Sequence, residues 1–195
     1  NPTYASEPDA FKKDFIVETG RAVGADVVVK YEERETYLWF VYGLGDVDRW
    51  DGFRWYDPVF DRRHNVNLVA SQGFGGGAWL VSARWNLGSG LPFTQSQGYY
   101  QAPSTGGGID GDYLTTNPDD ISIYLSGLNE GRLPAYHRLD LNVKRTWERG
   151  GGDIELSVGI TNVYSRQNIF YVNRITGQRK NQLPFLPSLG LDWSF

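Results

Sequence analysis

The chain alternates apolar and polar residues along most of its length. Between Ile154 and Thr161, for example, isoleucine, leucine and valine occupy every second position, and glutamate, serine, glycine and threonine fill the positions between them. A period of two residues is typical of a β-strand with two different faces, whereas a helix repeats every 3.6 residues. This period predicts seven strands, over residues 19–31, 36–46, 62–72, 78–88, 136–147, 153–164 and 187–195.

The segments between these strands fall into two length classes. Three are short, over residues 31–35, 73–77 and 148–152, and three are long, over residues 47–61, 89–135 and 165–186. Short and long segments alternate strictly, which is typical of outer-membrane barrels with tight periplasmic turns and long extracellular loops. We therefore predict that the short turns share one end of an antiparallel sheet with Phe195, and that the long segments share the other end.

Aromatic residues help to decide what the apolar face meets. In a membrane barrel the apolar face contacts lipid, whereas in a soluble sheet it covers a core. Two aromatic bands on either side of an aliphatic middle are typical of a lipid-facing barrel. One band, near the short turns, consists of Phe74, Trp79, Trp147 and Trp193, and the other, near the long segments, of Trp85, Tyr136 and Tyr164 with Leu87.

The pattern also assigns most side chains to a face, although residues 36–44 are apolar on both faces and their orientation stays open. The side chains expected to point outward to lipid are Leu139, Leu141, Val143, Ile154, Leu156, Val158, Ile160, Leu189 and Leu191. Those expected to point inward are Arg138, Asp140, Asn142, Glu155, Ser157 and Asp192. The charged lumen-facing candidates, expected to form ladders across strands, are Arg84, Arg138, Asp140, Lys144 and Glu155.

The predicted fold class is therefore all-β, as an antiparallel transmembrane β-barrel segment of about seven strands. Seven is odd and smaller than about eight, the strand number of the smallest outer-membrane barrels. An open edge in lipid would also leave backbone N–H and C=O groups unpaired, at a cost of several kcal/mol each. We expect residues 1–195 to be part of one larger barrel domain.

Composition agrees with this interpretation and narrows the function. Aromatic residues make up 15% of the chain and glycines number 24, which suits a β protein with two different faces. A net charge of −4 argues against nucleic-acid binding, and the absence of cysteine excludes disulfides and thiolate metal sites. The chain begins at Asn1 without a visible signal peptide, so we expect either a removed leader or an internal or C-terminal piece.

The last third of the sequence resembles a known family. The stretches RLPAYHRLDLNVKRTW, IELSVGITNVYSRQNIF and LPFLPSLGLDWSF are similar to the final three barrel strands of TonB-dependent outer-membrane receptors. FDRRHNVNLVASQGF and WLVSARWNLGSGLPFT resemble earlier strands of the same family, so the match spans roughly residues 18–195. One departure is Ser165, where the family more often has Asn or Asp.

The resemblance implies a barrel of about 22 strands with a plugged lumen, of which this chain would be the C-terminal part. It implies energised uptake of a scarce nutrient (a metal chelate, a vitamin or an oligosaccharide) across the bacterial outer membrane. The implied partners are the lipid bilayer, the barrel-assembly machinery, the rest of the barrel and plug, TonB acting through a plug outside this chain, and in some cases a surface lipoprotein. No enzymatic activity, catalytic residue, metal, cofactor or nucleic acid is expected.

The resemblance also gives the C-terminal strand a role. In outer-membrane proteins a terminal aromatic strand is read by the barrel-assembly machinery, and the same side chains would face lipid. The residues expected to carry this assembly signal are Leu189, Leu191, Trp193 and Phe195.

Aromatic residues mixed with arginines in the long segments are the best ligand candidates. Such side chains can grip a sugar, a metal chelate or a porphyrin, although the loop could equally pack on its own side chains. The candidates are Arg49, Trp50, Phe53, Arg54, Trp55 and Tyr56 in the first long segment and Tyr99 and Tyr100 in the second.

Three other motifs are interpreted as structural. GFGGGA, residues 73–78, matches a dinucleotide-binding pattern but precedes a strand, so we expect a tight turn with positive φ. His64 and His137 begin strands beside arginine and lack metal-ligand spacing. The aspartates of the longest segment lack EF-hand spacing and are interpreted as a solvated acidic loop; they are Asp110, Asp112, Asp119 and Asp120.

Two other architectures are compatible with the alternation. A small stand-alone barrel, as an adhesin or an outer-membrane enzyme, would need an eighth strand, for which residues 121–125 are the candidate. A soluble carbohydrate-binding sandwich would instead bury the apolar face against a second sheet.

Overall fold

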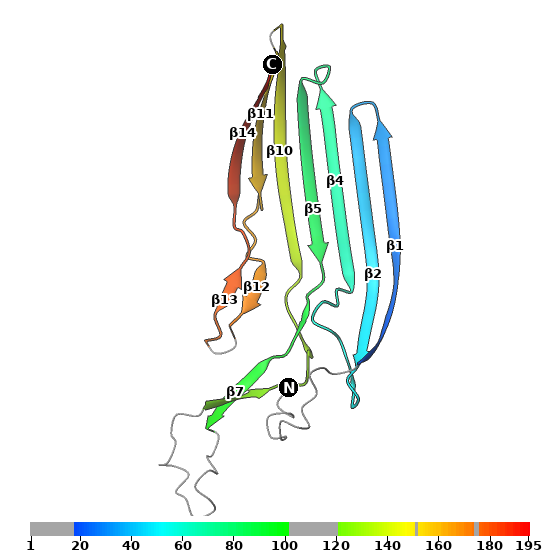
Figure 1. Ribbon diagram of the computed structural model, residues 1–195, viewed down its shortest axis with the longest axis vertical. Coiled ribbons are helices and arrows are strands. Elements are labelled where there is room, and N and C mark those ends of the chain that lie inside the picture. The colour runs from blue at the N-terminus through cyan, green and yellow to red at the C-terminus, as the bar shows by residue number, and fades with distance from the viewer. Residues whose placement is uncertain (1–17, 102–120, 151, 174–175) are drawn as a thin grey trace, which may run out of the picture.

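The computed structural model describes residues 18–101, 121–150, 152–173 and 176–195, and every regular element in these ranges is a β-strand. One antiparallel sheet has the order β1-β2-β4-β5-β10-β11-β14, with the short β3 beside β2 (Figure 1). Its strands are β1 (Thr19–Glu33), β2 (Thr36–Trp50), β3 (Trp55–Tyr56), β4 (His64–Phe74), β5 (Trp79–Gly88), β10 (Tyr136–Arg149), β11 (Gly152–Thr161) and β14 (Leu186–Ser194).

Three small two-stranded sheets lie in the long connections. They are β6 (Pro92–Phe93) with β9 (Gly131–Arg132), β7 (Ser96–Gln101) with β8 (Ile121–Leu125), and β12 (Ile169–Val172) with β13 (Arg179–Asn181). No helix in the described ranges is long and apolar enough to cross a membrane.

All seven predicted strands are confirmed, and their order in the sheet follows the chain. The largest differences lie at the long-connection end. β2 continues to Trp50 because β1 pairs with it along its whole length, from Thr19 opposite Trp50 to Glu33 opposite Thr36. The strand predicted to reach residue 164 ends at Thr161, because Asn162 takes a positive φ of 55° that breaks the ladder.

The register brings the apolar positions of all seven strands onto one face. Directly opposite residues in an antiparallel pair point to the same side of the sheet. Val143 of β10 lies opposite Val81 of β5 and Val158 of β11, and Val158 lies opposite Leu189 of β14. The outward and inward sets predicted for β10, β11 and β14 therefore do lie on opposite faces of the sheet, here called the apolar face and the polar face.

The same register settles the orientation of β2, which the pattern left open. Leu38, Phe40 and Tyr42 lie opposite Ala70, Leu68 and Val66 of β4, so they belong to the apolar face. Their neighbours Tyr37, Trp39 and Val41 belong to the polar face. A period-two pattern cannot decide between faces when both are apolar, and only the pairing with β4 decides it.

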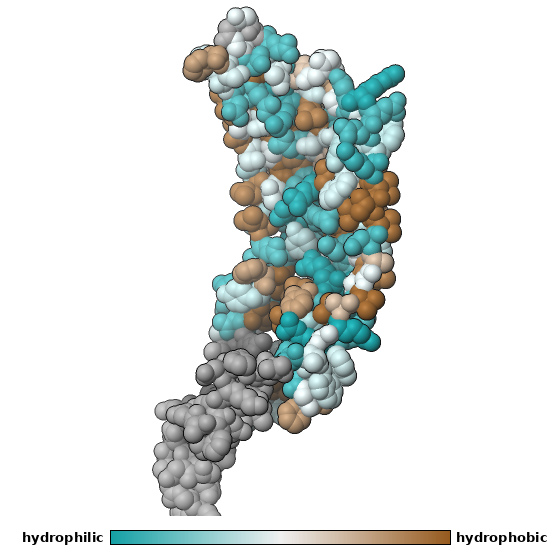
Figure 2. All heavy atoms as spheres, turned by 45° about the vertical axis from the view of Figure 1, so that its right-hand side comes forward, coloured by the Kyte–Doolittle hydropathy of each residue, from teal (hydrophilic) through white to brown (hydrophobic). Residues whose placement is uncertain are grey.

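Neither face of the sheet is covered in the described residues. No apolar side chain there is buried, and Leu189, Leu191 and Trp193 keep 75%, 70% and 68% of their surface exposed. Figure 2 shows polar residues over the middle of the face in view and hydrophobic residues along its margins. A sandwich would bury its apolar face against a second sheet, and no second sheet packs on this one in the described ranges.

The sheet is open at both edges. Within the described residues β1 pairs only with β2, and β14 pairs only with β11, so these strands do not close a barrel. Ile121–Leu125, the candidate eighth strand of a small barrel, is β8 and pairs with β7 outside the main sheet. This hairpin therefore does not complete a stand-alone barrel.

The two classes of connection lie at opposite ends of the sheet, as predicted. The tight turns and the C-terminus lie at the upper end in Figure 1, and β7, β12 and β13 lie at the lower end. We call these the short-turn end and the long-connection end. The glycine-rich stretch after β4 is a turn, with φ of 69°, 66° and 89° at Gly75, Gly76 and Gly77, values that favour glycine because a Cβ would be strained there.

One of the predicted aromatic bands needs correction. Tyr136 lies opposite Gly88 and next to His137, which places it on the polar face, where its ring lies 5.8 Å from the Arg62 guanidinium. At the long-connection end of the apolar face the structure instead has two similar pairs. Tyr42 Oη lies 2.8 Å from His64 Nδ1, and Tyr164 Oη lies 2.8 Å from His137 Nδ1.

Candidate functional site

The aromatic and arginine residues at the end of β2 hold one another through local contacts. The Trp50 and Trp55 rings lie 5.7 Å apart across the β2–β3 pairing. Arg49 donates a hydrogen bond to Glu18 Oε2 at 3.3 Å, and Tyr56 Oη donates to the same oxygen at 2.8 Å. Arg49 and Tyr56 are thus bonded to Glu18, which precedes β1, and do not present these groups freely to a ligand.

A turn at Asp51 presents the most exposed of the predicted ligand residues. Asp51 Oδ1 accepts hydrogen bonds from the N–H groups of Arg54 at 2.9 Å and Phe53 at 2.8 Å, and these bonds hold the pKa of Asp51 below its ordinary value. Phe53 and Trp55 remain 87% and 56% exposed. Of the six candidates in this segment, these two present free aromatic surface to a ligand.

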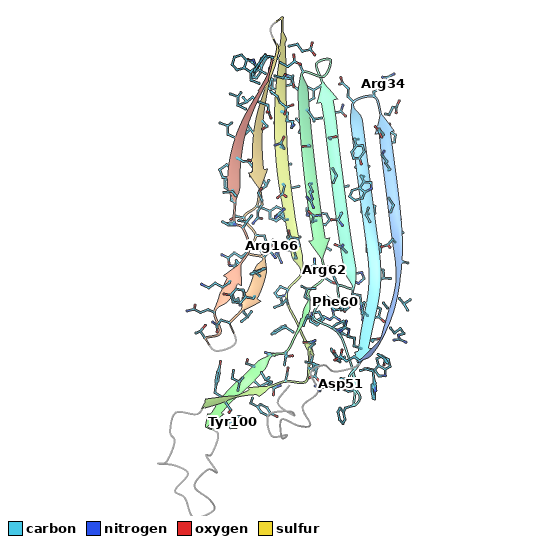
Figure 3. The ribbon with its side chains drawn as sticks, viewed as in Figure 1. Arg34, Asp51, Phe60, Arg62, Tyr100 and Arg166 are labelled. Atoms are coloured by element: carbon cyan, nitrogen blue, oxygen red, sulfur yellow. The ribbon has the colours of Figure 1, made fainter. Side chains whose placement is uncertain are left out.

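Tyr99 and Tyr100 lie on a separate element. They are neighbours on β7, opposite Ile123 and Ser122 of β8, and about half of each side chain is exposed. Figure 3 shows Asp51 and Tyr100 at the long-connection end but on different connections. The structure therefore does not bring the two predicted sets of ligand residues into one site.

A cleft of about 630 Å³ lies between the hairpins of the long connections. Its walls come from β6, β7, β9 and β12 and from the segments beside them, with Phe93, Tyr99, Phe170 and Tyr171 as aromatic lining. Arg179 of β13 also lines it and is exposed, without a side-chain partner in the described ranges. A concave, mostly apolar cavity with few polar groups is the usual form of a small-molecule site.

Of the sequence candidates, only Tyr99 lines this cleft. The aromatic residues of the third long segment, Phe170 and Tyr171, were not predicted to contact a ligand. The sequence could have identified them as ligand candidates, because NIFYVNR places aromatic and basic residues together in a long segment, as DRWDGFRWYDP does. Which of the three aromatic segments converge could not be predicted, because residues about 70 apart in sequence meet there.

A buried ion pair joins the first long connection to the second. Arg132 Nη2 lies 2.7 Å from Asp61 Oδ2 and also pairs with Asp57, and Asp61 is 1% exposed. Asn129 donates through Nδ2 to the Asp57 carbonyl at 2.9 Å. These bonds hold one wall of the cleft, since Arg132 lines it, and removing one member would leave an unpaired buried charge.

The charged residues predicted to face the lumen all lie on the polar face, and four of them form two ion pairs. Lys144 Nζ contacts Glu155 Oε1 at 2.6 Å across β10 and β11. Arg138 Nη2 contacts Asp140 Oδ2 at 2.8 Å along β10, and Asp140 lies directly opposite Arg84 of β5. These pairs are partly exposed, so each contributes about 0.2–1 kcal/mol at most.

The buried amide of Asn162 fixes the connection after β11. Its side chain is 0% exposed and donates through Nδ2 to the carbonyls of Arg166 at 3.0 Å and Leu183 at 2.9 Å. Its Oδ1 accepts from the Arg166 N–H at 3.0 Å, and its own N–H donates to Asp140 Oδ1 at 2.9 Å. All donors and acceptors of this amide except one lone pair are thereby used.

Asn168 and Ser165 complete this connection. Asn168 Oδ1 accepts from the His137 N–H at 3.1 Å, and its Nδ2 donates to the His137 carbonyl at 2.9 Å, in place of a strand partner. Ser165 has a φ of 49°. Asn and Asp tolerate this left-handed conformation better than Ser, so the backbone favours the residues of the resembled pattern, and nothing in the structure explains the serine.

Replacing Asn162 with alanine should therefore lower the free energy of unfolding by about 1–3 kcal/mol, because backbone carbonyls and an N–H would be left buried without partners. Replacing the exposed Asn65, whose side chain has no hydrogen bond in the described ranges, is the matched control and should cost less than about 0.5 kcal/mol. Denaturant unfolding of the full protein measures both. Equal effects of the two substitutions would contradict this role of Asn162.

The residues predicted to form the assembly signal follow one another along β14, from the middle of the sheet to the short-turn end. Leu189, Leu191 and Trp193 occupy alternate positions of β14 on the apolar face, and Phe195 follows with its ring 6.0 Å from that of Trp193. Phe195 is completely exposed. These side chains form an exposed apolar strip along an open sheet edge.

The structure gives no binding site to the described histidine and acidic residues. In the described ranges no group of three or more His, Asp or Glu side chains could hold a metal ion. His64 and His137 each contact a tyrosine hydroxyl, a partner that the sequence analysis did not predict. Asp110, Asp112, Asp119 and Asp120 lie outside the described residues. No protein-family model matches this chain, and no curated protein matches it.

Proposed function

We propose that this chain forms the C-terminal wall and extracellular loops of a TonB-dependent outer-membrane receptor that takes up a scarce nutrient by energised transport. The observation that carries the proposal is a single sheet of seven long strands whose apolar face no described residue covers. Water would penalise this face at about 25 cal/mol for each Å² of apolar surface. Lipid acyl chains would cover it without a second protein layer.

The proposal also gives the open edges and the polar face a use. The unpaired edges of β1 and β14 would be completed by the remaining strands of the barrel, because backbone groups in lipid must be paired. The paired charges of the polar face, such as Lys144 with Glu155, would line the lumen and contact a plug. Energy for transport would come through TonB acting on that plug, and no bond in the nutrient would be made or broken.

The cleft at the long-connection end supports a nutrient with apolar surface and a negative charge. Phe93, Phe170 and Tyr171 offer stacking surface, and Arg179 offers a cation without a side-chain partner in the described ranges. An anionic metal chelate or vitamin fits this lining better than a neutral oligosaccharide, whose many hydroxyls need many polar partners.

Cysteine labelling tests the proposed orientation, and the absence of native cysteine from this chain makes it specific. In the full-length protein, Phe53→Cys in a long connection should react with an impermeant maleimide on intact cells. Glu35→Cys in the first short turn should react only after the outer membrane is permeabilised. The wild-type protein is the control, and it measures any maleimide labelling at sites other than the introduced cysteine. Labelling of Glu35→Cys alone on intact cells would overturn the orientation.

Uptake measurements test the function itself. Deleting the gene should prevent growth when iron chelates or one vitamin are limiting, and the complete gene should restore growth. A protonophore should abolish uptake of that nutrient but not its binding to the cell surface, because the energy comes from the inner membrane. Uptake that survives the protonophore would show a passive pore, and uptake unaffected by the deletion would exclude the proposed role.

A further inference from the structure

Arg145 is an isolated cation on the apolar face. It lies opposite Trp79 of β5 and Leu156 of β11, so its side chain starts from the same face as Val143 and Trp147. Between Leu139 and Trp147 it is the one charged residue on that face of β10, since the others alternate onto the polar face. A charge at such a position needs a partner, because an unpaired charge on a lipid-facing surface is costly.

Two indole rings hold the guanidinium in place. Its carbon lies 4.3 Å from the centre of the Trp79 ring and 5.1 Å from that of the Trp147 ring. Arg145 Nε is buried and has no hydrogen-bond partner in the described residues. The rings attract the cation through their faces, but they accept no hydrogen bonds in the plane of the guanidinium. The terminal N–H groups of Arg145, which have no hydrogen-bond partner in the described residues, are the donors that an outside group can reach.

In the described residues, the strands around Arg145 offer no carboxylate to these donors. On the apolar face, the described positions of β4, β5, β11 and β14 and of β10 up to Trp147 contain no Asp or Glu. The nearest charged pair on β10 and β11, Lys144 with Glu155, lies on the polar face. The partner of Arg145 must come from outside the sheet.

The depth of Arg145 indicates what that partner is. Phe74, Trp79, Trp147 and Trp193 form an aromatic band across five strands at the short-turn end, with the Phe74 and Trp79 rings 6.2 Å apart. Trp is enriched where a protein surface meets lipid headgroups. Arg145 therefore starts on the membrane side of the band, and its long side chain, held beside Trp147, can extend outward to the level of lipid phosphates. A planar guanidinium binds phosphate oxygens in a bidentate manner.

We propose that Arg145, Trp79 and Trp147 form a binding site for the phosphate group of a phospholipid in the leaflet at the short-turn end. The proposal rests on the proposed membrane function and adds a specific lipid contact to it. The phosphate would accept hydrogen bonds from Arg145, and the two indoles would flank the headgroup and shield the ion pair from acyl chains. An anionic lipid such as phosphatidylglycerol would bind best, because the site carries one uncompensated positive charge.

Native mass spectrometry of the full-length protein in detergent tests the site, with phosphatidylglycerol as the probe. Wild type should retain this lipid about tenfold better than Arg145→Gln. Arg145→Lys should be intermediate, because it keeps the charge but loses the bidentate geometry. Arg84→Gln, which removes a cation from the polar face, is the matched control and should retain the lipid as wild type does.

Two further measurements are needed. One distinguishes a lipid phosphate from free phosphate, and the other distinguishes failure of the lipid site from failure of the proposed membrane function. Inorganic phosphate at millimolar concentration should not displace the lipid, and displacement would indicate a site for the free anion instead. The labelling pattern of Glu35→Cys and Phe53→Cys reports independently whether the protein has the proposed membrane orientation. Correct labelling with equal lipid retention by wild type and Arg145→Gln would overturn the lipid site alone. Incorrect labelling would overturn the membrane function first.

Discussion

Replacing Val143 with lysine is expected to destabilise the protein in a bilayer by about 2–4 kcal/mol, the cost of a lysine facing the middle of the membrane. Val143 lies in the middle of β10, between Val81 and Val158 on the apolar face. The charge would have no partner, since that row continues to Leu189 of β14. The measurement is the free energy of unfolding in lipid vesicles by denaturant titration.

The adjacent residue provides a matched control. Asn142 precedes Val143 on the same strand but lies on the polar face, opposite Ser82 and Gly159. Asn142→Lys adds the same charge at the same depth and should change stability by less than about 1 kcal/mol, because the polar face would border a hydrated lumen in the proposed barrel. A small effect of both substitutions would mean that the apolar face does not contact lipid. A large effect of Asn142→Lys alone would reverse the assignment of the faces.

Deleting Phe195 is expected to lower the number of receptors on the cell surface several-fold without changing ligand affinity per folded molecule. Phe195 is completely exposed, so its removal costs the sheet few contacts, and full burial of a Phe is worth only roughly 1.5–3 kcal/mol. Assembly is different, because a chain that the assembly machinery fails to recognise stays outside the membrane with its apolar strands exposed and is degraded.

Counting receptors with a surface antibody and measuring nutrient binding on intact cells separates the two quantities. The cleft proposed to bind the nutrient lies at the long-connection end and Phe195 at the short-turn end, so no direct effect on affinity is expected. Replacing Phe195 with tyrosine keeps an aromatic ring and serves as the control, with near-normal counts. Normal counts with weakened binding after deletion would show that Phe195 acts on the ligand site and has no role in assembly.

The strands and the face on which each side chain lies could be predicted, because the alternation that specifies them is local in the sequence. Residues 154–161 alternate strictly, and their faces in β11 followed directly. Strand ends were less certain, because they depend on single residues in special conformations. Asn162 ends β11 through a positive φ and a buried amide whose partners include Leu183, 21 residues away. The alternation of residues near Asn162 does not indicate such a distant partner.

The candidate site was predicted only in part, for the same reason. Aromatic residues in the long segments were identified, but Arg49 and Tyr56 bond to Glu18 and Trp50 packs on Trp55. Tyr99 instead joins Phe93 and Phe170 in a cleft. Composition indicates that a loop is suited to bind a ligand. Whether its side chains face a cavity or each other depends on how separate connections pack, and composition does not record that.

The sequence by itself determined the all-β class, the seven strands, the two ends and the face of each clearly alternating strand. These features follow from a period of two and from the order of short and long segments, which act between near neighbours in the chain. Only the tertiary structure decided the face of β2, the place of Tyr136, the joining of Arg132 to Asp61, and the isolation of Arg145 between Trp79 and Trp147. Each of these depends on register or on contacts between distant residues, and a local pattern contains no information on either.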